Sequence, residues 1–313
     1  MCGPRPGGVL VPASRGQYND LMSSTSSSLV VITDVPSLPP RPLDANKGTF
    51  GRVLIVAGSR GMSGAAVLCA TGALRGGAGL VRLAVPEGIW TIVAAANPCY
   101  TTAPLPQDDH GRLSAVALPQ LLDLVRSNSV AALGPGLGQS VPLGDMIVAL
   151  LEQTATPLVL DADALNVLVG RLDALGKHRG PVVLTPHPGE FARLLGCDIA
   201  AVQAQRQELA ADFARTHGVI MVLKGRGTVV TDGRRIYVNT TGNPGMATGG
   251  TGDVLCGLIA ALLGQGLETF AAAQLGVYLH GRAGDLAREQ FGETSLIASD
   301  LLTFLPQAFQ RRP

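Results

Sequence analysis

The chain has 313 residues, and its 24 Lys and Arg residues balance 23 Asp and Glu residues to a formal net charge of +1. This balance excludes the strong attraction that nucleic acids or anionic membranes exert on basic proteins, so we expect a small-molecule ligand. Charged residues make up only 15% of the chain, against roughly 25% in an average soluble protein. A chain of this length can bury a large core, and its low charge predicts a homo-oligomer.

The five cysteines indicate neither a zinc site nor a disulfide framework, because they are odd in number and show no Cys-x-x-Cys spacing. Free cysteines are typical of a reducing compartment, and the N-terminus lacks the apolar run of a signal peptide. The longest weakly charged stretch, 254–279, is interrupted by glycines and Glu268, which favours two buried helices over a membrane span. We therefore predict a cytoplasmic protein without a membrane segment.

Residues 1–45 are rich in Pro, Ser and Gly and show no sustained period, so we predict a disordered tail followed by one domain over residues 46–313. Within that domain, short apolar runs alternate with segments long enough for crossover helices. The predicted strands are 53–57, 80–85, 130–133, 158–160, 182–184 and 219–223. Continuous apolar runs are typical of strands that are covered on both faces, as in a parallel sheet.

Beyond residue 223 the pattern changes to two short strands, 228–231 and 235–239, on either side of Asp232-Gly233-Arg234. An Asp-Gly pair between such runs predicts a hairpin. The predicted helices that follow are 253–263, 269–288 and 295–304. The predicted fold class is α/β, a doubly wound and mostly parallel sheet with an antiparallel hairpin at one edge and helices on both faces.

A glycine-rich segment runs from Thr240 directly into the predicted helix at Asp253. Its five glycines free the backbone N–H groups to turn toward one point, and the positive end of the following helix lies there too. The segment therefore predicts an anion-binding loop. Asp253 could be an ordinary N-cap, but capping does not need Gly249-Gly250-Thr251-Gly252 before it. Beside a bound phosphate, an ionised Asp253 could accept a proton from a hydroxyl group.

Other polar residues follow predicted strands, at the edge where open α/β sheets bind ligands. Lys224 suits a polyphosphate, although a solvated charge at a strand end is common. His187 and Glu190 are candidate ligand contacts, but the prolines around His187 could simply end the strand and start a helix. Of Asp161 and Asp163, we expect one near magnesium and the other as a helix cap.

Glycines also follow two of the predicted strands. Those in Gly134-Pro135-Gly136-Leu137-Gly138 would let a ligand approach the backbone, although a tight strand-to-helix turn would look similar. Gly58, Gly61 and Gly64 do not have the GxGxxG spacing of a dinucleotide-binding fold. No Walker A motif occurs in the chain.

A Gly-Thr-Gly-Asp sequence at the start of a late helix resembles the anion hole and catalytic base of the ribokinase-like superfamily. Further motifs, in order over about residues 47–305, resemble the NAD(P)H-hydrate dehydratase family. They are Lys47-Gly48-Thr49-Phe50-Gly51, Gly76-Gly77-Ala78-Gly79, Leu133-Gly134-Pro135-Gly136, Asp161-Ala162-Asp163-Ala164-Leu165-Asn166, Thr185-Pro186-His187-Pro188-Gly189-Glu190 and Leu223-Lys224-Gly225. Several motifs in one order are far more specific than any single motif.

The resemblance implies a repair enzyme that converts the (S)-hydrates of NADH and NADPH back to the coenzymes, with magnesium and with ADP rather than ATP as co-substrate. Hydroxide is a poor leaving group, so phosphorylation of the ring hydroxyl first would let phosphate depart. The resemblance also implies a homotetramer. Because no epimerase domain precedes residue 47, we expect a single activity and a separate epimerase as functional partner.

The resemblance implies roles for individual residues, with Asp253 as the catalytic base that also contacts the hydrate. The other implied hydrate-binding residues are Ala65, Gly136, His187, Glu190 and Arg193. The implied nucleotide-binding residues are Lys224, Gly225, Arg226, Gly227, Thr228, Asn243, Gly245, Thr248, Gly249, Gly250, Thr251 and Gly252. The implied magnesium ligands, directly or through water, are Glu190 and Asp161.

Two other functions fit the same residues. A small-molecule kinase of the same superfamily, acting on a vitamin-precursor alcohol, would release a stable phosphorylated product. A non-catalytic nucleotide sensor would keep all its properties after the substitution Asp253→Asn. The enzyme prediction instead expects loss of turnover with nucleotide binding retained.

Overall fold

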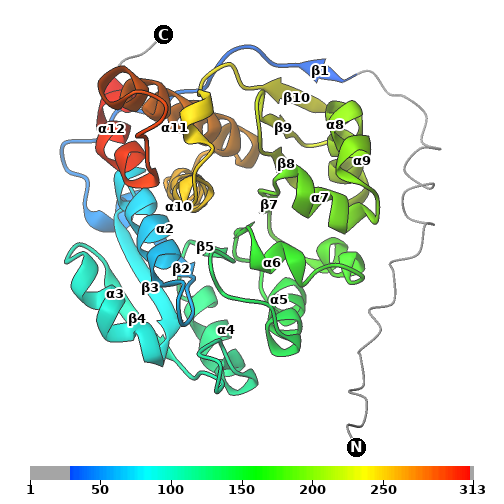
Figure 1. Ribbon diagram of the computed structural model, residues 1–313. Helices are drawn as coiled ribbons and strands as arrows, with labels where there is room; N and C mark the ends of the chain where they lie inside the picture. Colours follow the sequence, from blue (N-terminus) through cyan, green and yellow to red (C-terminus); the bar gives the residue numbers. More distant parts are fainter. Residues whose placement is uncertain (1–28, 311–313) are drawn as a thin grey trace, which may run out of the picture.

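The computed structural model describes residues 29–310, which form a ten-stranded sheet with helices on both faces (Figure 1). The strands are β1 (Val30–Val31), β2 (Arg52–Val56), β3 (Leu80–Pro86), β4 (Thr101–Leu105), β5 (Val130–Leu133), β6 (Leu158–Leu160), β7 (Val182–Leu184), β8 (Ile220–Leu223), β9 (Val229–Thr231) and β10 (Arg235–Val238). Their order across the sheet is β1-β10-β9-β8-β7-β6-β5-β2-β3-β4. Among the described strands, β9 is antiparallel to both neighbours and every other pair is parallel. The predicted fold class is confirmed.

The helices cover the two faces of the sheet separately. They are α2 (Ser63–Arg75), α3 (Trp90–Ala96), α4 (Leu118–Arg126), α5 (Val141–Gln153), α6 (Asp163–Asn166), α7 (Pro188–Leu195), α8 (Ile199–Ala204), α9 (Arg206–His217), α10 (Thr251–Gly264), α11 (Thr269–Phe291) and α12 (Ala298–Gln310). Val53 and Ile55 of β2 pack with α2, α3, α10 and α11. Leu54 and Val56 pack with α4, α5, α7 and α9 on the other face. Because side chains alternate between the faces, both faces need apolar residues, which accounts for the continuous apolar runs.

Helix α10 lies between α2 and α11 (Figure 1). All of its residues from Val254 to Leu262 are buried, so it has no polar face. Glycines let it approach α2 closely, since a Cβ on Gly72 would lie 2.6 Å from the carbonyl oxygen of Val254. This packing fixes the position of the first turn of α10, which carries Asp253.

Two strands were not predicted. Strand β4 contains Pro104 and lies at one edge of the sheet, where a proline that cannot donate a hydrogen bond is tolerated. Strand β1 forms the other edge beyond the predicted hairpin and pairs with β10, while Gln274 Nε2 donates to the carbonyl oxygen of Asp34 at 2.8 Å. The predicted disordered tail therefore does not extend to residue 45, and residues 1–28 lie outside the described residues.

The late helices are longer than predicted. Helix α10 begins at Thr251, before Asp253, and α12 begins at Ala298 and continues past Pro306 to Gln310. Within residues 29–310, no helix has both the length and the hydropathy that crossing a bilayer requires. The described cysteines are free thiols, and Cys2 lies outside the described residues.

Candidate active site

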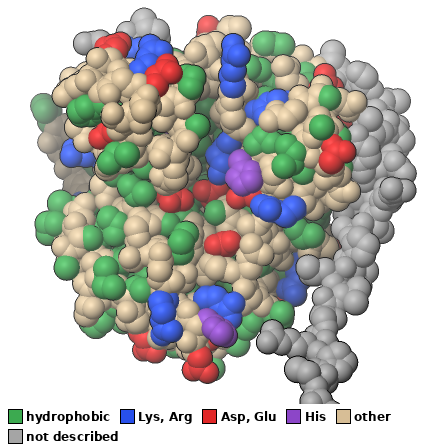
Figure 2. Space-filling model, viewed as in Figure 1, with side chains coloured by type: hydrophobic (Ala, Val, Ile, Leu, Met, Phe, Trp, Pro, Cys, Tyr) green, Lys and Arg blue, Asp and Glu red, His purple; other side chains and the backbone are tan. Residues whose placement is uncertain are grey.

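Charged side chains gather in the middle of one face of the molecule, where acidic groups lie next to basic and histidine groups (Figure 2). They come from segments that follow the carboxyl ends of β6, β7 and β8. The segments after β2 and β5 lie against each other, since Gly58 N donates to the carbonyl oxygen of Pro135 at 2.7 Å, and Gly138 N joins the segment after β5 to Asp163 after β6. From β2 the chain continues to β3 on one side of β2, and β5 later pairs on the other side of β2. The ends of β2 and β5 therefore form a topological switch point, where such sheets bind ligands.

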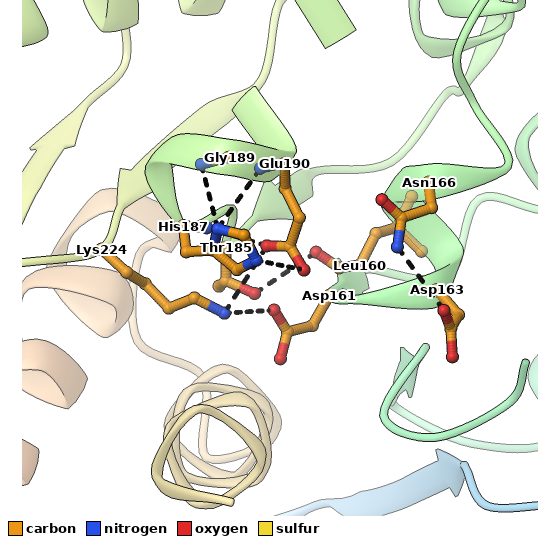
Figure 3. A network of polar contacts seen from close by, with 9 residues as sticks. All are labelled: Leu160, Asp161, Asp163, Asn166, Thr185, His187, Gly189, Glu190 and Lys224. Atoms are coloured by element: carbon orange, nitrogen blue, oxygen red, sulfur yellow. Dashed lines mark hydrogen bonds and ion pairs between the residues drawn. The ribbon is translucent and has the colours of Figure 1, made fainter. Parts of the chain in front are cut away.

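A partly buried lysine connects two carboxylates at the centre of this site (Figure 3). Lys224 Nζ lies 2.7 Å from Asp161 Oδ1 and 4.0 Å from Glu190 Oε2. The side chains of Asp161 and Glu190 are only 1% and 6% exposed, and that of Lys224 is 18% exposed. Burial works to lower the pKa of Lys224, but the two carboxylates outweigh it and raise the pKa above its usual value. The site therefore contains a fixed positive charge held by two negative ones.

His187 occupies the N-cap position of α7, with Pro188 at the first helical position. Its Nδ1 accepts hydrogen bonds from Gly189 N at 3.0 Å and Glu190 N at 3.3 Å, while Glu190 Oε2 accepts one from His187 N at 2.8 Å. Burial lowers the pKa of His187, so the ring is neutral at neutral pH. His187 thus both starts the helix and lies in the site, half exposed beside Glu190.

The two aspartates after β6 have different partners. Asp161 pairs with Lys224, whereas Asp163 Oδ2 accepts a hydrogen bond from Gly138 N at 2.8 Å. The predicted helix cap is wrong, because Asp163 is the first residue of α6 and no side chain caps that helix. Ala162 between them has a φ of 48°, which is strained for a residue with a side chain and typical of functional sites.

The loop after β5 brings two of the predicted hydrate-binding residues, Gly136 and Ala65, together. Gly136 packs on α2, where a Cβ added to it would lie 3.0 Å from the Cβ of Ala65. Ser59 Oγ donates to the carbonyl oxygen of Gly136 at 2.8 Å, which holds the loop against the segment after β2. Met62 lies beside Gly136 with its side chain half exposed, and the segment 59–63 that contains it has no aromatic residue. The site therefore offers a thioether beside this loop and no aromatic ring from that segment.

Gly134→Ala is expected to destabilise the fold by about 3 kcal/mol or more. Gly134 has a φ of 132°, and a Cβ there would overlap the carbonyl oxygen of Asp161. Gly170→Ala is the matched control, because Gly170 also has a positive φ of 78° but no atom within 4 Å of the added Cβ. Urea unfolding of the two variants checks the prediction, and equal losses of stability would contradict it.

Asp253 is the third residue of α10, with Gly250 at the N-cap position. The alternative that Asp253 caps the helix is therefore excluded, and its side chain accepts no hydrogen bond from another residue between 29 and 310. Burial, followed by the nearby charge of Asp161, raises the pKa of Asp253 to about 7, while Lys224 opposes the shift. A carboxylate with a pKa near neutrality and a free oxygen is suited to act as a general base.

The nucleotide-binding prediction covers two segments that meet at the first turn of α10. Lys224 Nζ lies 3.2 Å from where a Cβ of Gly252 would be. Thr251 Oγ1 donates to the carbonyl oxygens of Met246 at 3.1 Å and Thr248 at 3.2 Å, which folds the glycine-rich loop back onto the helix. Backbone N–H groups at this helix start, together with Lys224, form a site suited to an anion.

The remaining predicted nucleotide residues lie around these two segments. Thr228 Oγ1 donates to the carbonyl oxygen of Gly225 at 2.9 Å and closes the loop after β8, and Asn243 Oδ1 accepts a hydrogen bond from Gly245 N at 3.1 Å. Arg226, in the same loop, and Arg193, on α7, have exposed side chains. No described residue forms an ion pair with either arginine.

Sequence reasoning missed Arg206, which stands at the start of α9. Its Nη2 donates to the carbonyl oxygens of Leu223 at 3.0 Å and Lys224 at 3.1 Å, so the guanidinium group holds the backbone from which Lys224 extends. Nothing in the sequence distinguishes this arginine from a surface residue, because its partners are backbone atoms about eighteen positions away.

We expect kcat/KM to rise about tenfold per pH unit below pH 7 and to level off above it, because kcat/KM reports the pKa of the essential base in the free protein. The group concerned is Asp253, whose pKa is raised to about 7. Its carboxyl group acts as a base only after it loses its proton. A pH profile measured at low substrate concentration checks this. A profile that is flat from pH 5 to 8 would contradict the assignment of Asp253.

A doubly wound sheet with an aspartate in the first turn of a late helix, next to a glycine-rich loop and a partly buried lysine, defines a ribokinase-like protein. Residues 53–307 match the family described as NAD(P)H-hydrate dehydratase, and the chain belongs to this family. The family prediction is confirmed.

Individual relatives agree with this membership. The chain is 49% identical over 271 residues to the bifunctional NAD(P)H-hydrate repair enzyme Nnr of Moorella thermoacetica, a match that covers 86% of this chain and 51% of that one. It is similar to the crystal structure of an ADP/ATP-dependent NAD(P)H-hydrate dehydratase from Bacillus subtilis co-crystallised with ATP and Mg²⁺, with 33% identity, a TM-score of 0.78 and coverage of 88% and 94%. A ribokinase-like superfamily protein from Enterococcus faecalis V583 has 26% identity, a TM-score of 0.74 and coverage of 90% and 95%. The chain spans about half the length of the bifunctional relative.

Proposed function

We propose that this protein dehydrates the (S)-hydrates of NADH and NADPH to the coenzymes at the expense of ADP, giving AMP and phosphate. The observation that carries the proposal is Asp253, whose pKa is about 7 and which directly follows the glycine-rich loop beside Lys224. Membership in the NAD(P)H-hydrate dehydratase family supports the substrate. Similarity to the ADP/ATP-dependent enzyme of Bacillus subtilis supports an adenine nucleotide as co-substrate.

The chemistry proceeds in two steps. Asp253 accepts the proton of the ring hydroxyl, whose oxygen forms a bond to the terminal phosphorus as the bond to the nucleotide's bridging oxygen breaks. The carbon–oxygen bond then breaks, phosphate leaves with the bonding electron pair, and the neighbouring carbon loses its proton to the departing phosphate, which restores the dihydropyridine. Lys224 and the N–H groups at the start of α10 stabilise the charge on the transferred group.

Magnesium fits the donor chemistry of the site, since Asp161 and Glu190 are buried carboxylates and Mg²⁺ prefers oxygen ligands. No group of three or more His, Cys, Asp or Glu side chains within residues 29–310 is arranged to hold a metal. Mg²⁺ commonly uses one or two carboxylates together with water and substrate phosphates. Asp161 and Glu190 would hold it here, and it would neutralise charge on the phosphates.

We also propose that the protein is a cytoplasmic homotetramer that works with a separate epimerase. The low content of charged residues supports association, and the epimerase would supply the (S)-hydrate from the other epimer. Mass measurement in solution checks the oligomeric state. A monomer at working concentration would contradict this part of the proposal.

The function is tested by mixing purified protein, hydrated NADH, Mg²⁺ and either ADP or ATP. We expect the near-ultraviolet absorbance of NADH to return, faster with ADP than with ATP, together with AMP and phosphate. A kinase for a vitamin-precursor alcohol would leave this absorbance unchanged and release a phosphorylated alcohol when offered one. A nucleotide sensor would bind ADP without any turnover.

A further inference from the structure

The segment that enters α10 lies along one face of α11. Near its start, Asn239 Nδ2 donates to the carbonyl oxygen of Val277 at 3.4 Å, and Thr241 Oγ1 donates to that of Tyr278 at 2.8 Å. Further on, the segment contacts later positions of the same helix. The α11 residues in contact are Val277, Tyr278, Gly281, Gly284 and Asp285, which we call the contact face. Their spacing of three and four places them on one side of the helix.

The middle of the contact face has no side chains, which lets the segment approach closely. A Cβ on Gly281 would lie 2.7 Å from both the carbonyl carbon and the carbonyl oxygen of Thr241. Real Cβ atoms do not come this close to backbone atoms. A Cβ on Gly284 would likewise overlap the side chain of Met246. The segment is therefore fitted to this helix over about two turns.

Asp285 supplies the strongest bonds of the contact face. Its Oδ2 accepts a hydrogen bond from Gly242 N at 2.9 Å, and its Oδ1 accepts one from Asn243 Nδ2 at 3.0 Å. The Asn243 side chain in turn accepts a bond from Gly245 N at 3.1 Å. Two hydrogen bonds thus end on one carboxylate, and one of them orients the Asn243 amide whose oxygen accepts the third.

The same helix also holds the other end of the glycine-rich loop. His280 Nε2 lies 2.8 Å from the carbonyl oxygen of Thr251, and because a carbonyl only accepts, Nε2 is the donor. Burial lowers the pKa of His280 to about 4, so the ring is neutral at working pH. α11 therefore fixes the loop at residues 242–243 and again at 251, on both sides of Gly249 and Gly250.

We propose that Asp285 is a positioning residue for the nucleotide: through Gly242 and Asn243 it holds the glycine-rich loop in the conformation that receives the phosphates. The inference rests on the proposed function, since it concerns the affinity of the same loop. Asp285 bonds to the loop backbone and to Asn243, at the start of the loop, whereas Asp253 and Lys224 lie at its end and beside it. Its loss should therefore weaken nucleotide binding while the chemical step at saturation is preserved.

The test compares Asp285→Asn with the double variant Asn243→Asp/Asp285→Asn. In the single variant the asparagine offers one acceptor oxygen in place of two, so one of the three bonds, from Gly242 N, from the side chain of Asn243 or from Gly245 N, is lost. The double variant exchanges the acid and the amide and can re-form all three bonds. Glu289→Gln is the control, because it removes a carboxylate from an exposed position of the same helix.

Binding of Mg-ADP and Mg-ATP is measured by calorimetry, and kcat and KM by recovery of NADH absorbance. We expect Asp285→Asn to raise the Kd and KM for nucleotide about tenfold with kcat within about twofold, and the double variant to restore most of the affinity. Glu289→Gln should behave as wild type. Unchanged affinity in Asp285→Asn would overturn the inference. Wild-type protein that binds no nucleotide would instead refute the proposed function.

Discussion

Asp253→Asn is expected to lower kcat by about a thousandfold, with nucleotide affinity within about threefold of wild type. Asn has nearly the same shape as Asp but cannot accept the hydroxyl proton. The nucleotide contacts come from the loop before it and from Lys224, which the substitution leaves in place. Single-turnover recovery of NADH absorbance measures the chemical step, and calorimetry with Mg-ADP measures binding.

The control for Asp253→Asn is Asp123→Asn, which removes a carboxylate that is 84% exposed on α4. This control should retain wild-type kcat. A kcat for Asp253→Asn within about tenfold of wild type would leave the protein without its proposed base. Loss of nucleotide binding in the same variant would show that Asp253 acts mainly through the loop conformation.

The same substitution has an expected effect on stability that misfolding could not produce. The folded-state pKa of Asp253 is raised to about 7 from 3.8, so the folded protein binds more protons than the unfolded chain between these values. The contribution of Asp253 to wild-type stability should therefore fall as pH rises from about 4 to about 7, by at most on the order of 4 kcal/mol. The asparagine that replaces Asp253 does not ionise, so the variant should be more stable than wild type at pH 8 and similar to it at pH 4.

The strands with two covered faces could be predicted from the sequence because burial on both sides demands continuous apolar residues. β5 and β6 were predicted with their observed bounds. β1 and β4 could not be, because one has two exposed residues and the other contains a proline. Edge strands are specified by the partner that they pair with, and a partner distant in the chain leaves no local pattern.

The structure brings several of the predicted site residues together, but their contacts could not be predicted from the sequence. Glycine-rich and acidic motifs that follow strands indicated the carboxyl-end edge of the sheet, because parallel strands bring their carboxyl ends together. The pairing of Lys224 with Asp161 joins residues 63 positions apart, and no spacing rule predicts it. Asp285 was missed for a related reason, since one acidic residue in a mostly buried helix resembles an ordinary polar position.

The charge of Lys224 also affects the proposed base, Asp253. Without Lys224, Asp161 and Glu190 would be buried anions with no counter-charge, which is energetically costly. Their repulsion would then raise the pKa of Asp253 without opposition. Lys224 offsets this charge and works to lower the pKa of Asp253, which keeps the base able to ionise near neutral pH. One residue thus supports the fold, the base and the anion site at once.

Lys224→Met is expected to destabilise the protein by about 3 to 5 kcal/mol at pH 8 and to abolish measurable nucleotide binding. Met fills a similar volume but leaves Asp161 and Glu190 buried without a counter-charge. Unpaired buried carboxylates have raised pKa values, so the folded variant takes up protons as pH falls. The destabilisation should therefore be clearly smaller at pH 5 than at pH 8.

Lys177→Met separates this effect from the loss of any ion-paired lysine. Lys177 pairs with Glu152 at 2.9 Å and Asp173 at 3.4 Å, but its side chain is 53% exposed. Exposed pairs contribute little to stability, because water solvates the partners that remain. Urea unfolding of both variants at pH 5 and pH 8 measures the two losses of stability. The two sites differ in the burial of the carboxylates that remain. Equal and pH-independent losses would mean that Lys224 is solvated and that the charge balance proposed for Asp253 does not exist.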